Sequence, residues 1–536
     1  MATRHDDELA ARPSDEEPMD RPSGEERMDA ARAKGIALAL HAARQPDGLA
    51  ISSPTGDRTF AGLDGRANAL ARALRRRGLG DGSGVALVCA NRPEFAEVWA
   101  ATQRAGLRLT PVNWHLTAGE AAYVIEDCEA VAVVVEDRFP ALAEAALSSP
   151  TATVRMAVGG PLPGFESYDD AVAAESPDAL EDPTLGSTML YTSGTTGRPK
   201  GVHRSERVPT ARVTLAPYGY RDGDVNLCTG PLYHAAPLAF SLSLPLLAGT
   251  GVVLMDGWDA EEALRLIEAK RVTHSHMVQT MSSCLMALPD EVRDRSDLSS
   301  LRFVIHGAAP CPVGVKGRLI EWLGPIVHEY YAATEGVGTS VDAATWLTKP
   351  GTVGKVRPPG QVVVGDEEAT PLPTGEAGLL WLRAPAEGRF HYFKDSVKTG
   401  STYRGDYFTL GDVGYLDDDG FLFLTDRSAN LIISGGVNIY PAEVDGVLLD
   451  HPAVGDVATI GVPSEEWGEE VKAVVEPGPG VTPGPELAAE LIAFCRERLA
   501  GFKCPRTVDF VEALPRADNG KIYKRVLRER YRRAAG

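Results

Sequence analysis

A run of small, hydroxyl-bearing and basic residues between positions 191 and 202 is the part of this chain best suited to chemistry. It reads Tyr-Thr-Ser-Gly-Thr-Thr-Gly-Arg-Pro-Lys-Gly-Val. Its three glycines, one proline and four Ser or Thr residues favour a loop over a helix or a strand. Backbone N–H groups and hydroxyls in such a loop can converge on an anion, and Lys200 adds a positive charge. The run therefore predicts a phosphate-binding loop where a strand containing Met189 and Leu190 ends.

The spacing of this run differs from that of the loop in phosphate-transferring NTPases. Those loops need Gly, four residues, then Gly-Lys and Ser or Thr. Here the corresponding residues are Gly194, Gly197 and Lys200, and Pro199 directly precedes the lysine. On composition alone, a surface linker rich in Ser, Thr and Gly is the alternative interpretation.

Composition limits what the rest of the chain can be. At 536 residues the chain is too long for one core, so two or more domains are expected. The net charge of −20, from 54 basic and 74 acidic residues, disfavours binding to nucleic acid or to an anionic membrane surface. No apolar run approaches the ~18–20 residues needed to cross a membrane. Seven cysteines without Cys-x-x-Cys spacing indicate reduced thiols in a cytoplasmic protein, and residues 1–27 predict a disordered acidic tail.

Hydrophobic periodicity predicts which elements position the loop. Residues 31–79 have a helical pattern, and residues 84–90, 107–112 and 130–135 are expected to be buried strands separated by helices. This alternation favours a parallel sheet covered by helices. Residues 147–186 are irregular and rich in Pro, Gly and Asp.

Three histidines are candidates for a site. His234 precedes the apolar run 238–247, where a lone histidine is more often structural than catalytic. His274 and His276 would share one face of a strand, which makes a metal site conceivable. Because no third ligand is visible nearby, a structural role is the favoured interpretation for these two.

Four further segments follow in order, and they lie at residues 327–338, 407–420, 426–443 and 514–525. They contain Tyr-Ala-Ala-Thr-Glu, Leu-Gly-Asp, a Gly-Gly turn and Pro-Arg-Ala-Asp-Asn-Gly-Lys. With the phosphate loop, these segments resemble the motifs of the adenylate-forming superfamily, which includes acyl-CoA synthetases, adenylation domains and luciferases. The resemblance runs from about residue 30 to the end of the chain.

The resemblance implies a role for particular residues in binding ATP and AMP. Tyr331 would stack on adenine, Thr334 would contact the α-phosphate, Asp412 would accept both ribose hydroxyls, and Glu335 would hold Mg²⁺. Lys521 would reach from the C-terminal part to the substrate carboxylate, and Arg427 would help to hold ribose or phosphate. The full set implied for the nucleotide is Thr192, Ser193, Gly194, Thr195, Thr196, Gly197, Lys200, Gly307, Ala308, Ala309, Glu329, Tyr330, Tyr331, Thr334, Asp412, Arg427 and Lys521. Those implied to be catalytic are Lys521, Glu335 and His234.

The acyl side and the hinge both depart from the family pattern. By resemblance, His234, Tyr330 and Ala332 border the acyl pocket, and Ala332 stands where the family often has glycine. The added volume predicts a pocket that is shorter or redirected, which disfavours very long acyl chains. Ala429 occupies the hinge position, where Asp or Lys is common, and Ser434, Gly435 and Gly436 would serve the thioester-forming step.

The sequence therefore predicts an α/β protein with a large N-terminal domain of helix-covered β-sheets at residues 28–428. A small, mobile C-terminal α+β domain is expected at residues 429–536. The resemblance implies an acyl-CoA synthetase that uses ATP, Mg²⁺ and CoA to convert a carboxylic acid, a small-molecule substrate, into an acyl-CoA. An enzyme that loads a carrier protein, a luciferase-like oxygenase and an inactive nucleotide-binding protein are the alternatives. The sequence leaves the identity of the acid open, and the acid can belong to fatty acid metabolism or to another pathway. Assembly into a homo-oligomer is also left open.

Overall fold

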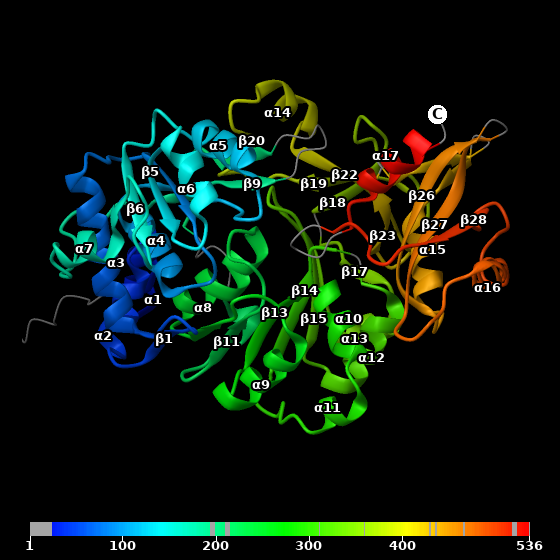
Figure 1. Ribbon diagram of the computed structural model, residues 1–536, viewed down its shortest axis with the longest axis horizontal. Coiled ribbons are helices and arrows are strands. Elements are labelled where there is room, and N and C mark those ends of the chain that lie inside the picture. Colours follow the sequence, from blue (N-terminus) through cyan, green and yellow to red (C-terminus); the bar gives the residue numbers. More distant parts are fainter. Residues whose placement is uncertain are drawn as a thin grey trace, which may run out of the picture.

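The computed structural model describes residues 24–192, 199–209, 215–309, 311–357, 360–427, 430–434, 437–464, 467–516 and 522–534. The N-terminal elements lie at one end of the molecule and the C-terminal elements at the other, with a long central sheet between them (Figure 1). No helix in these described ranges has both the length and the apolar character that a membrane span requires.

The first sheet has six strands in the order β7-β6-β5-β3-β4-β8, and every pairing in it is parallel. Its strands are β3 (Gly84–Val88), β4 (Arg108–Pro111), β5 (Ala130–Glu136), β6 (Val154–Val158), β7 (Glu166–Ser167) and β8 (Ser187–Thr188). The helices that accompany them are α3 (Phe60–Arg76), α4 (Pro93–Arg104), α5 (Ala118–Asp127), α6 (Pro140–Leu147) and α7 (Tyr168–Ala173). All of β3 is buried, as expected for a parallel strand covered on both faces. The predicted helix-covered parallel sheet is therefore confirmed.

The second sheet has eight strands in the order β16-β15-β14-β13-β11-β12-β1-β2. Its strands are β1 (Leu49–Ser52), β2 (Arg58–Thr59), β11 (Val225–Cys228), β12 (Gly251–Leu254), β13 (His274–Val278), β14 (Phe303–Gly307), β15 (Val327–Ala332) and β16 (Val337–Asp342). Strands β11 to β15 run parallel, so the carboxyl ends of β13, β14 and β15 meet at one edge. That edge of an open α/β sheet is where ligands commonly bind.

Helical segments connect the strands of the second sheet. They are η2 (Ala216–Tyr218), η3 (Pro237–Ser243), α8 (Leu244–Ala248), α9 (Ala260–Lys270), α10 (Gln279–Ala287), α11 (Asp290–Asp294), α12 (Val313–Leu323) and α13 (Ala343–Thr348). Segment η3 is π-helical, a conformation that often occurs at functional sites. It packs against β11 and β13.

Two antiparallel sheets flank the carboxyl edge of the second sheet. One has the order β20-β10-β9, with β9 (Leu190–Thr192), β10 (Lys200–Arg204) and β20 (Phe390–Tyr392). The other has the order β17-β23-β22-β19-β18, and β21 pairs with β22. Its strands are β17 (Thr352–Lys355), β18 (Val362–Gly365), β19 (Gly378–Arg383), β21 (Tyr403–Arg404), β22 (Tyr407–Leu416) and β23 (Phe421–Arg427), and α14 (Ser396–Thr402) follows β20.

The C-terminal elements form a separate sheet with its own core. Strands β24 (Ile432–Ser434), β25 (Val437–Ile439), β26 (Val454–Ser464), β27 (Gly468–Pro477) and β28 (Thr507–Phe510) are accompanied by α15 (Pro441–Leu449), α16 (Pro485–Arg496) and α17 (Lys524–Ala534). Figure 1 shows this unit, in orange and red, at one end of the molecule. The α+β character predicted for this part of the chain is confirmed, whereas the boundary at residues 428 and 429 lies outside the described residues and stays a prediction.

Three segments differ from the sequence expectation. The helical stretch predicted for residues 31–79 is wrong as a whole, since it divides into the end of α1 (Gly24–Ala33), α2 (Ala37–Arg44), strands β1 and β2, and α3. Strand β1 pairs with β12, some 200 residues away, and a pairing at this distance cannot be predicted from the local sequence. Segment 147–186, expected to be irregular, contains β6, β7 and α7. Helix α1 also includes the last four residues of the 27-residue tail that the sequence predicts to be disordered.

Candidate functional site

The ends of the phosphate loop are fixed by strand pairing. Strands β9 and β10 are antiparallel, with Thr192 directly opposite Lys200. Between them, Ser193, Gly194, Thr195, Thr196 and Gly197 lie outside the described residues. Lys200 Nζ is 3.3 Å from Asp395 Oδ2. Thr192, at the end of the strand before the loop, and Lys200, at the start of the strand after it, are therefore adjacent in space.

Glu335 lies beside the same small sheet. Its side chain is buried, and the Tyr392 hydroxyl donates a hydrogen bond of 3.0 Å to Glu335 Oε1. Tyr392 is in β20, opposite Val202 of β10, and Lys200 Nζ is 5.7 Å from the centre of the Tyr392 ring. Burial and the nearby Glu335 carboxylate raise the pKa of Tyr392, so its hydroxyl keeps its proton. The phosphate loop and the Glu335 carboxylate are thus joined through one tyrosine.

Arg204, at the end of β10, fixes the backbone around Glu335. Its Nη2 donates to the carbonyl oxygens of Thr334 at 3.1 Å and of Glu335 at 2.8 Å. Both contacts are to the turn that follows β15, so β10 sets where this turn lies. Arg204 therefore fixes the turn that carries the Thr334 hydroxyl and the Glu335 carboxylate.

Tyr331 and Asp412 come together although 81 residues separate them. The Tyr331 hydroxyl donates a hydrogen bond of 2.9 Å to Asp412 Oδ2. A methyl group added at Gly338 of β16 would lie 2.5 Å from the Tyr331 ring. The ring can therefore occupy this position only because residue 338 has no side chain. Asp412 lies opposite Arg427 in the pairing of β22 with β23, and the Arg427 side chain lies outside the described residues.

The turn after β14 has unusual backbone geometry. Ala308 has a φ of 68°, in the left-handed region that a residue with a Cβ seldom occupies. Such strain persists where the surrounding structure requires it, and it is common at ligand-binding sites. Gly307 precedes it in β14 and Ala309 follows it. The turn therefore presents a short stretch of backbone with small side chains at the carboxyl edge of the second sheet.

Glu329 differs from the other candidate nucleotide residues because it lies in a buried ion pair. It is buried, and Lys316 of α12 forms a buried ion pair with it through Oε2. Burial raises the pKa of Glu329 and lowers that of Lys316, and the opposite charge of each partner counteracts both shifts. His306 is aligned with Glu329 on the neighbouring strand, and its two ring nitrogens have no hydrogen-bond partner among the described residues.

The acyl side is made of small and aromatic residues. Tyr330, Phe303 and Ile305 form a cluster against which Phe240, Ala236 and Ala332 pack. His234 is two residues before Ala236, in a loop whose Gly230 carbonyl and Leu232 N–H both bond to the buried Asn91 side chain at 3.0 Å. The structure thus brings Tyr330 and Ala332 together and places the loop that carries His234 beside them.

His274 and His276 lie on one face of β13, as the sequence predicts. His274 Nε2 is 2.8 Å from the Tyr218 carbonyl and its Nδ1 is 2.8 Å from Thr273 Oγ1. Among the residues that the structure describes, no group of three His, Cys, Asp or Glu could hold a metal ion. Both histidines are buried in contacts within the fold.

Several predicted residues cannot be placed. Ala429, Gly435, Gly436 and Lys521 lie outside the described residues. Ser434 ends β24 and is opposite Val437 of β25.

Sequence reasoning missed three residues of this region, Arg204, Lys316 and Tyr392. It named His276 as a structural histidine or a metal ligand, and not as the partner of Tyr330. Arg204 carried a weak signal, because it ends the strand that begins at Lys200. Tyr392 carried none beyond a short aromatic run, since its position beside Glu335 depends on a pairing between β10 and β20.

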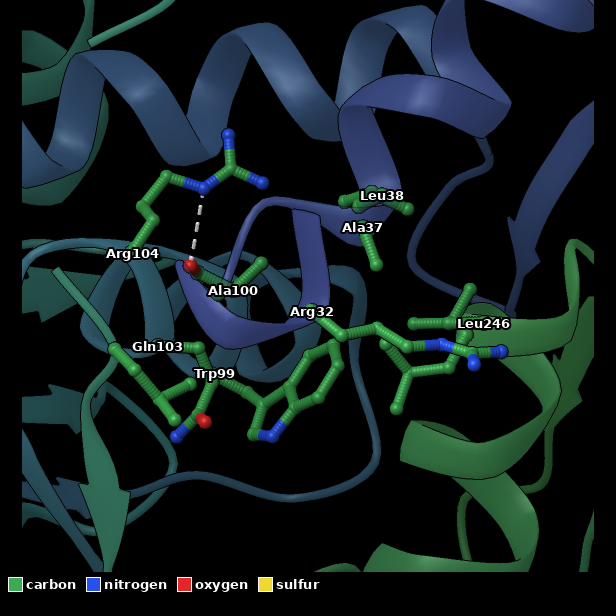
Figure 2. A pocket seen from close by; sticks show the side chains of 11 residues that line it. Arg32, Ala37, Leu38, Trp99, Ala100, Gln103, Arg104 and Leu246 are labelled. Carbon is green, nitrogen blue, oxygen red and sulfur yellow. Dashed lines mark hydrogen bonds between the residues drawn. The ribbon is translucent and has the colours of Figure 1, made fainter. Parts of the chain in front are cut away.

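A separate cavity lies away from these residues. Figure 2 shows it among residues of α1, α2, α4 and α8, with Leu38, Trp99 and Leu246 in its wall. Its volume of about 30 Å³ suits one or two water molecules and excludes a nucleotide or an organic acid. Arg104 is among the residues that line it, and the Arg104 Nε donates to the Ala100 carbonyl at 3.2 Å (Figure 2).

Comparison with known proteins agrees with this geometry. Residues 38–389 match a family model described as "AMP-binding enzyme", and residues 443–521 match one described as "AMP-binding enzyme C-terminal domain". A fatty acid–[acyl-carrier-protein] ligase from Streptomyces coeruleorubidus is 31% identical over 502 residues, which are 92% of this chain and 95% of the relative. A feruloyl-CoA synthase from an Amycolatopsis species is 34% identical over 480 residues, 88% of this chain and 94% of the relative.

A solved structure has the same architecture. It is an anthranilate CoA ligase in complex with anthranoyl-AMP, with a TM-score of 0.85 and 25% sequence identity. The match covers 94% of this chain and 98% of the solved one.

Proposed function

We propose, from the premise that this chain belongs to the adenylate-forming superfamily as an AMP-forming acyl-CoA synthetase, that the residues around Glu335 carry its first half-reaction. In that half-reaction a carboxylate oxygen of the acid bonds to the α-phosphorus of ATP. The bond from that phosphorus to the bridging oxygen breaks, and pyrophosphate leaves. The product is acyl-AMP, in which AMP is a good leaving group.

In the second half-reaction the CoA thiol gives up its proton and its sulfur bonds to the acyl carbon. The acyl–oxygen bond to AMP breaks, and acyl-CoA and AMP are the products. We assign no protein cysteine to this transfer. The protein contributes mainly by placing the reactants and by stabilising charge.

The proposed roles follow from position and charge. Residues 192–200 hold the leaving pyrophosphate, with Lys200 as its mobile cation. Tyr331 and Asp412 hold adenine and ribose beside the turn formed by Gly307, Ala308 and Ala309. Lys521 meets the carboxylate and the ribose oxygens, and His234 closes the acyl side.

Mg²⁺ suits the donors available at this place. Glu335 offers a buried carboxylate, and Thr334 offers a neighbouring hydroxyl, both of which are the hard oxygen donors that Mg²⁺ prefers. When bound, Mg²⁺ would offset the negative charge of the phosphates. Tyr392 would keep the Glu335 carboxylate oriented by donating to Oε1.

One observation carries this proposal most directly. The Tyr392 hydroxyl bonds to Glu335 while Lys200 lies over the Tyr392 ring, so a phosphate-binding cation and a metal-binding carboxylate share one support. A nucleotide-binding scaffold without chemistry would not need this link between the two charges.

Release of pyrophosphate tests the proposal. The full-length protein would be incubated with ATP, Mg²⁺ and a panel of fatty, aromatic and cyclic acids, with and without CoA. We expect CoA-dependent turnover on one class of acid. Nucleotide binding without pyrophosphate release on any of the acids would contradict it.

A carrier protein is a second candidate for the final thiol. It is supported by one relative, whose name gives an acyl-carrier protein as its acceptor. Turnover that stays slow with CoA and accelerates with a phosphopantetheinylated carrier would favour this alternative.

The proposal also covers the kind of acid that the enzyme uses and its location in the cell. Tyr330 and Ala332 add volume at the acyl side, which supports a shorter or redirected pocket for the acid. The seven cysteines are free thiols, which supports a cytoplasmic enzyme.

A further inference from the structure

A hydrogen-bonded pair of residues lies at the inner side of the proposed acyl region. His276 Nε2 is 3.0 Å from the Tyr330 hydroxyl. His276 is in β13 and Tyr330 is in β15, so the bond spans the strand β14 between them. The pair is on the face of the sheet that η3 covers, and Glu329 and Tyr331 are on the opposite face.

The Tyr330 ring crosses β14 at the one position without a side chain. A methyl group added at Gly307 would lie 2.6 Å from Cε1 and from Cζ of this ring. The ring therefore lies directly over the backbone of Gly307, at the end of β14. A ligand entering along this face from the carboxyl edge meets the ring and its hydroxyl before it reaches His276.

Aromatic rings form much of the rest of this region, together with Ile305, Ala236 and Ala332. The Phe240 ring stacks on His276 with centroids 5.4 Å apart and an interplanar angle of 11°, and it is 4.8 Å from the Tyr330 ring. Phe303 stacks on His328 at 4.3 Å. Flat faces of this kind favour a ring over a flexible chain, because rings gain stacking contacts and lose little conformational entropy.

The pair leaves one polar function unused. His276 Nδ1 is buried and has no hydrogen-bond partner among the described residues. Burial lowers the pKa of His276 to about 3, so the imidazole is neutral and carries one N–H. If Tyr330 donates to Nε2, the tyrosine oxygen can still accept from a ligand; if Nε2 donates, the Tyr330 proton is free to be donated. In both arrangements Tyr330 offers a hydrogen bond to a ligand.

We infer that His276 and Tyr330 form the polar end of the acyl site, and that the acid is a compact ring compound with a hydroxyl or oxo group remote from its carboxylate. This inference rests on the proposed function and on the placement of the acyl region beside Ala332. Tyr330 is the contact residue, and His276 is a positioning residue that orients its hydroxyl. A saturated alkyl chain would offer the Tyr330 hydroxyl no second hydrogen-bond partner and would cover it with apolar atoms, which is unfavourable.

The test compares matched acids in the full-length enzyme. Each pair shares one skeleton, from benzoate, phenylacetate, cinnamate and a fused two-ring propanoate, and differs only in a ring hydroxyl or methyl group. Straight-chain fatty acids complete the panel, and CoA-dependent pyrophosphate release gives kcat/KM. We expect at least about a tenfold preference for the hydroxyl member in one or more pairs, since a site built to bond a hydroxyl rejects the analogue that lacks it.

Variants separate this role from a structural one. Tyr330→Phe removes one oxygen and should reduce the preference within each pair to near unity, mainly by lowering kcat/KM for the hydroxyl member. Tyr218→Phe is the matched control, because Tyr218 packs in the same cluster and its hydroxyl is not in the pair. We expect it to leave the preference unchanged, and thermal unfolding would report whether each variant is folded.

Three results would overturn the inference alone: equal kcat/KM for both members of every pair, best turnover on long unbranched fatty acids, or an unchanged preference in folded Tyr330→Phe. Absence of pyrophosphate release with every acid, the straight chains included, would overturn the proposed function itself.

Discussion

Strand β15 has two faces that differ in chemistry. Glu329 and Tyr331 lie on one face, where Glu329 pairs with Lys316 and Tyr331 bonds to Asp412. Tyr330 lies on the other face and bonds to the neutral His276. One face is charged and holds carboxylates in place, whereas the other is aromatic and carries a single neutral polar pair.

The difference indicates how one strand can serve two ligands. A nucleotide needs fixed charges, and these act in the same way whichever acid is present. The acid needs a surface of particular shape and polarity. Changes on the charged face should therefore affect all acids equally, and changes on the aromatic face should alter the choice among acids.

The largest expected effect is on stability and comes from the charged face. Lys316→Met leaves Glu329 buried without its partner, which should lower the free energy of unfolding by about 3–5 kcal/mol. Denaturant unfolding at neutral pH would measure this loss. The double variant Lys316→Met, Glu329→Leu should recover most of it, and Tyr330→Phe on the other face should cost only about 1 kcal/mol. Equal losses in the two single variants would contradict the contrast between the faces.

A cation at the reacting centre should give the next largest effect. Lys521→Ala should lower the rate of acyl-AMP formation by about 10²–10³-fold, because it removes one electrostatic contact to the reacting groups. Formation of acyl-CoA from supplied acyl-AMP should be spared. Single-turnover kinetics of each half-reaction would measure both, and the loss should be the same for every acid. Equal loss in both half-reactions would argue against this role.

A smaller loss is expected at the support of Glu335. Tyr392→Phe removes a hydrogen bond to a carboxylate, worth about 1.5–3 kcal/mol, and should lower kcat/KM by about tenfold or more. It should also raise the Mg²⁺ concentration needed for half-maximal rate and weaken the binding of Mn²⁺ in the presence of ATP. Tyr403→Phe is the control, since the Tyr403 hydroxyl bonds to the Phe390 carbonyl at 2.9 Å and not to Glu335. An unchanged Mg²⁺ requirement in Tyr392→Phe would separate Tyr392 from the metal site.

The last prediction concerns how the free energy of unfolding depends on pH. Burial and the nearby charge of Lys316 lower the pKa of His306 from 6.5 to about 3, and His276 adds to this shift from the other side of the sheet. Between these values the unfolded chain binds a proton that the folded chain does not, so stability falls as pH decreases. His306→Gln should therefore reduce the slope of unfolding free energy by about 1.4 kcal/mol per pH unit in this range. Unfolding measured at several pH values would show it, and an unchanged slope would mean that His306 is protonated in the folded chain.

Local patterns predicted much of this fold. Strands β3, β4 and β5 lie within two residues of the expected ranges, because continuous apolar runs and clear turn residues bound them. Strands β1 and β6 were not predictable in the same way. Each owes its place to strands that are distant in the sequence or to a short run with no distinctive pattern.

The candidate site divides along the same line. Thr192, Lys200, Tyr331 and Asp412 were identified from motifs, and the structure places two pairs of them in contact or opposite each other. The role of Tyr392 could not be predicted, because it depends on the register in which β20 pairs with β10. The bond between Tyr330 and His276 could not be predicted either, because the two residues are on β15 and β13, with β14 between them.

The two glycines beneath consecutive tyrosines have a consequence for how such an enzyme can change over evolutionary time. Gly307 makes room for the Tyr330 ring, and Gly338 makes room for the Tyr331 ring. A single mutation at one of these sites would displace one ring and leave its neighbour in place. Selection could then alter the choice of acid in a lineage while nucleotide use is inherited unchanged, and it could do so without rebuilding the strand that both tyrosines share.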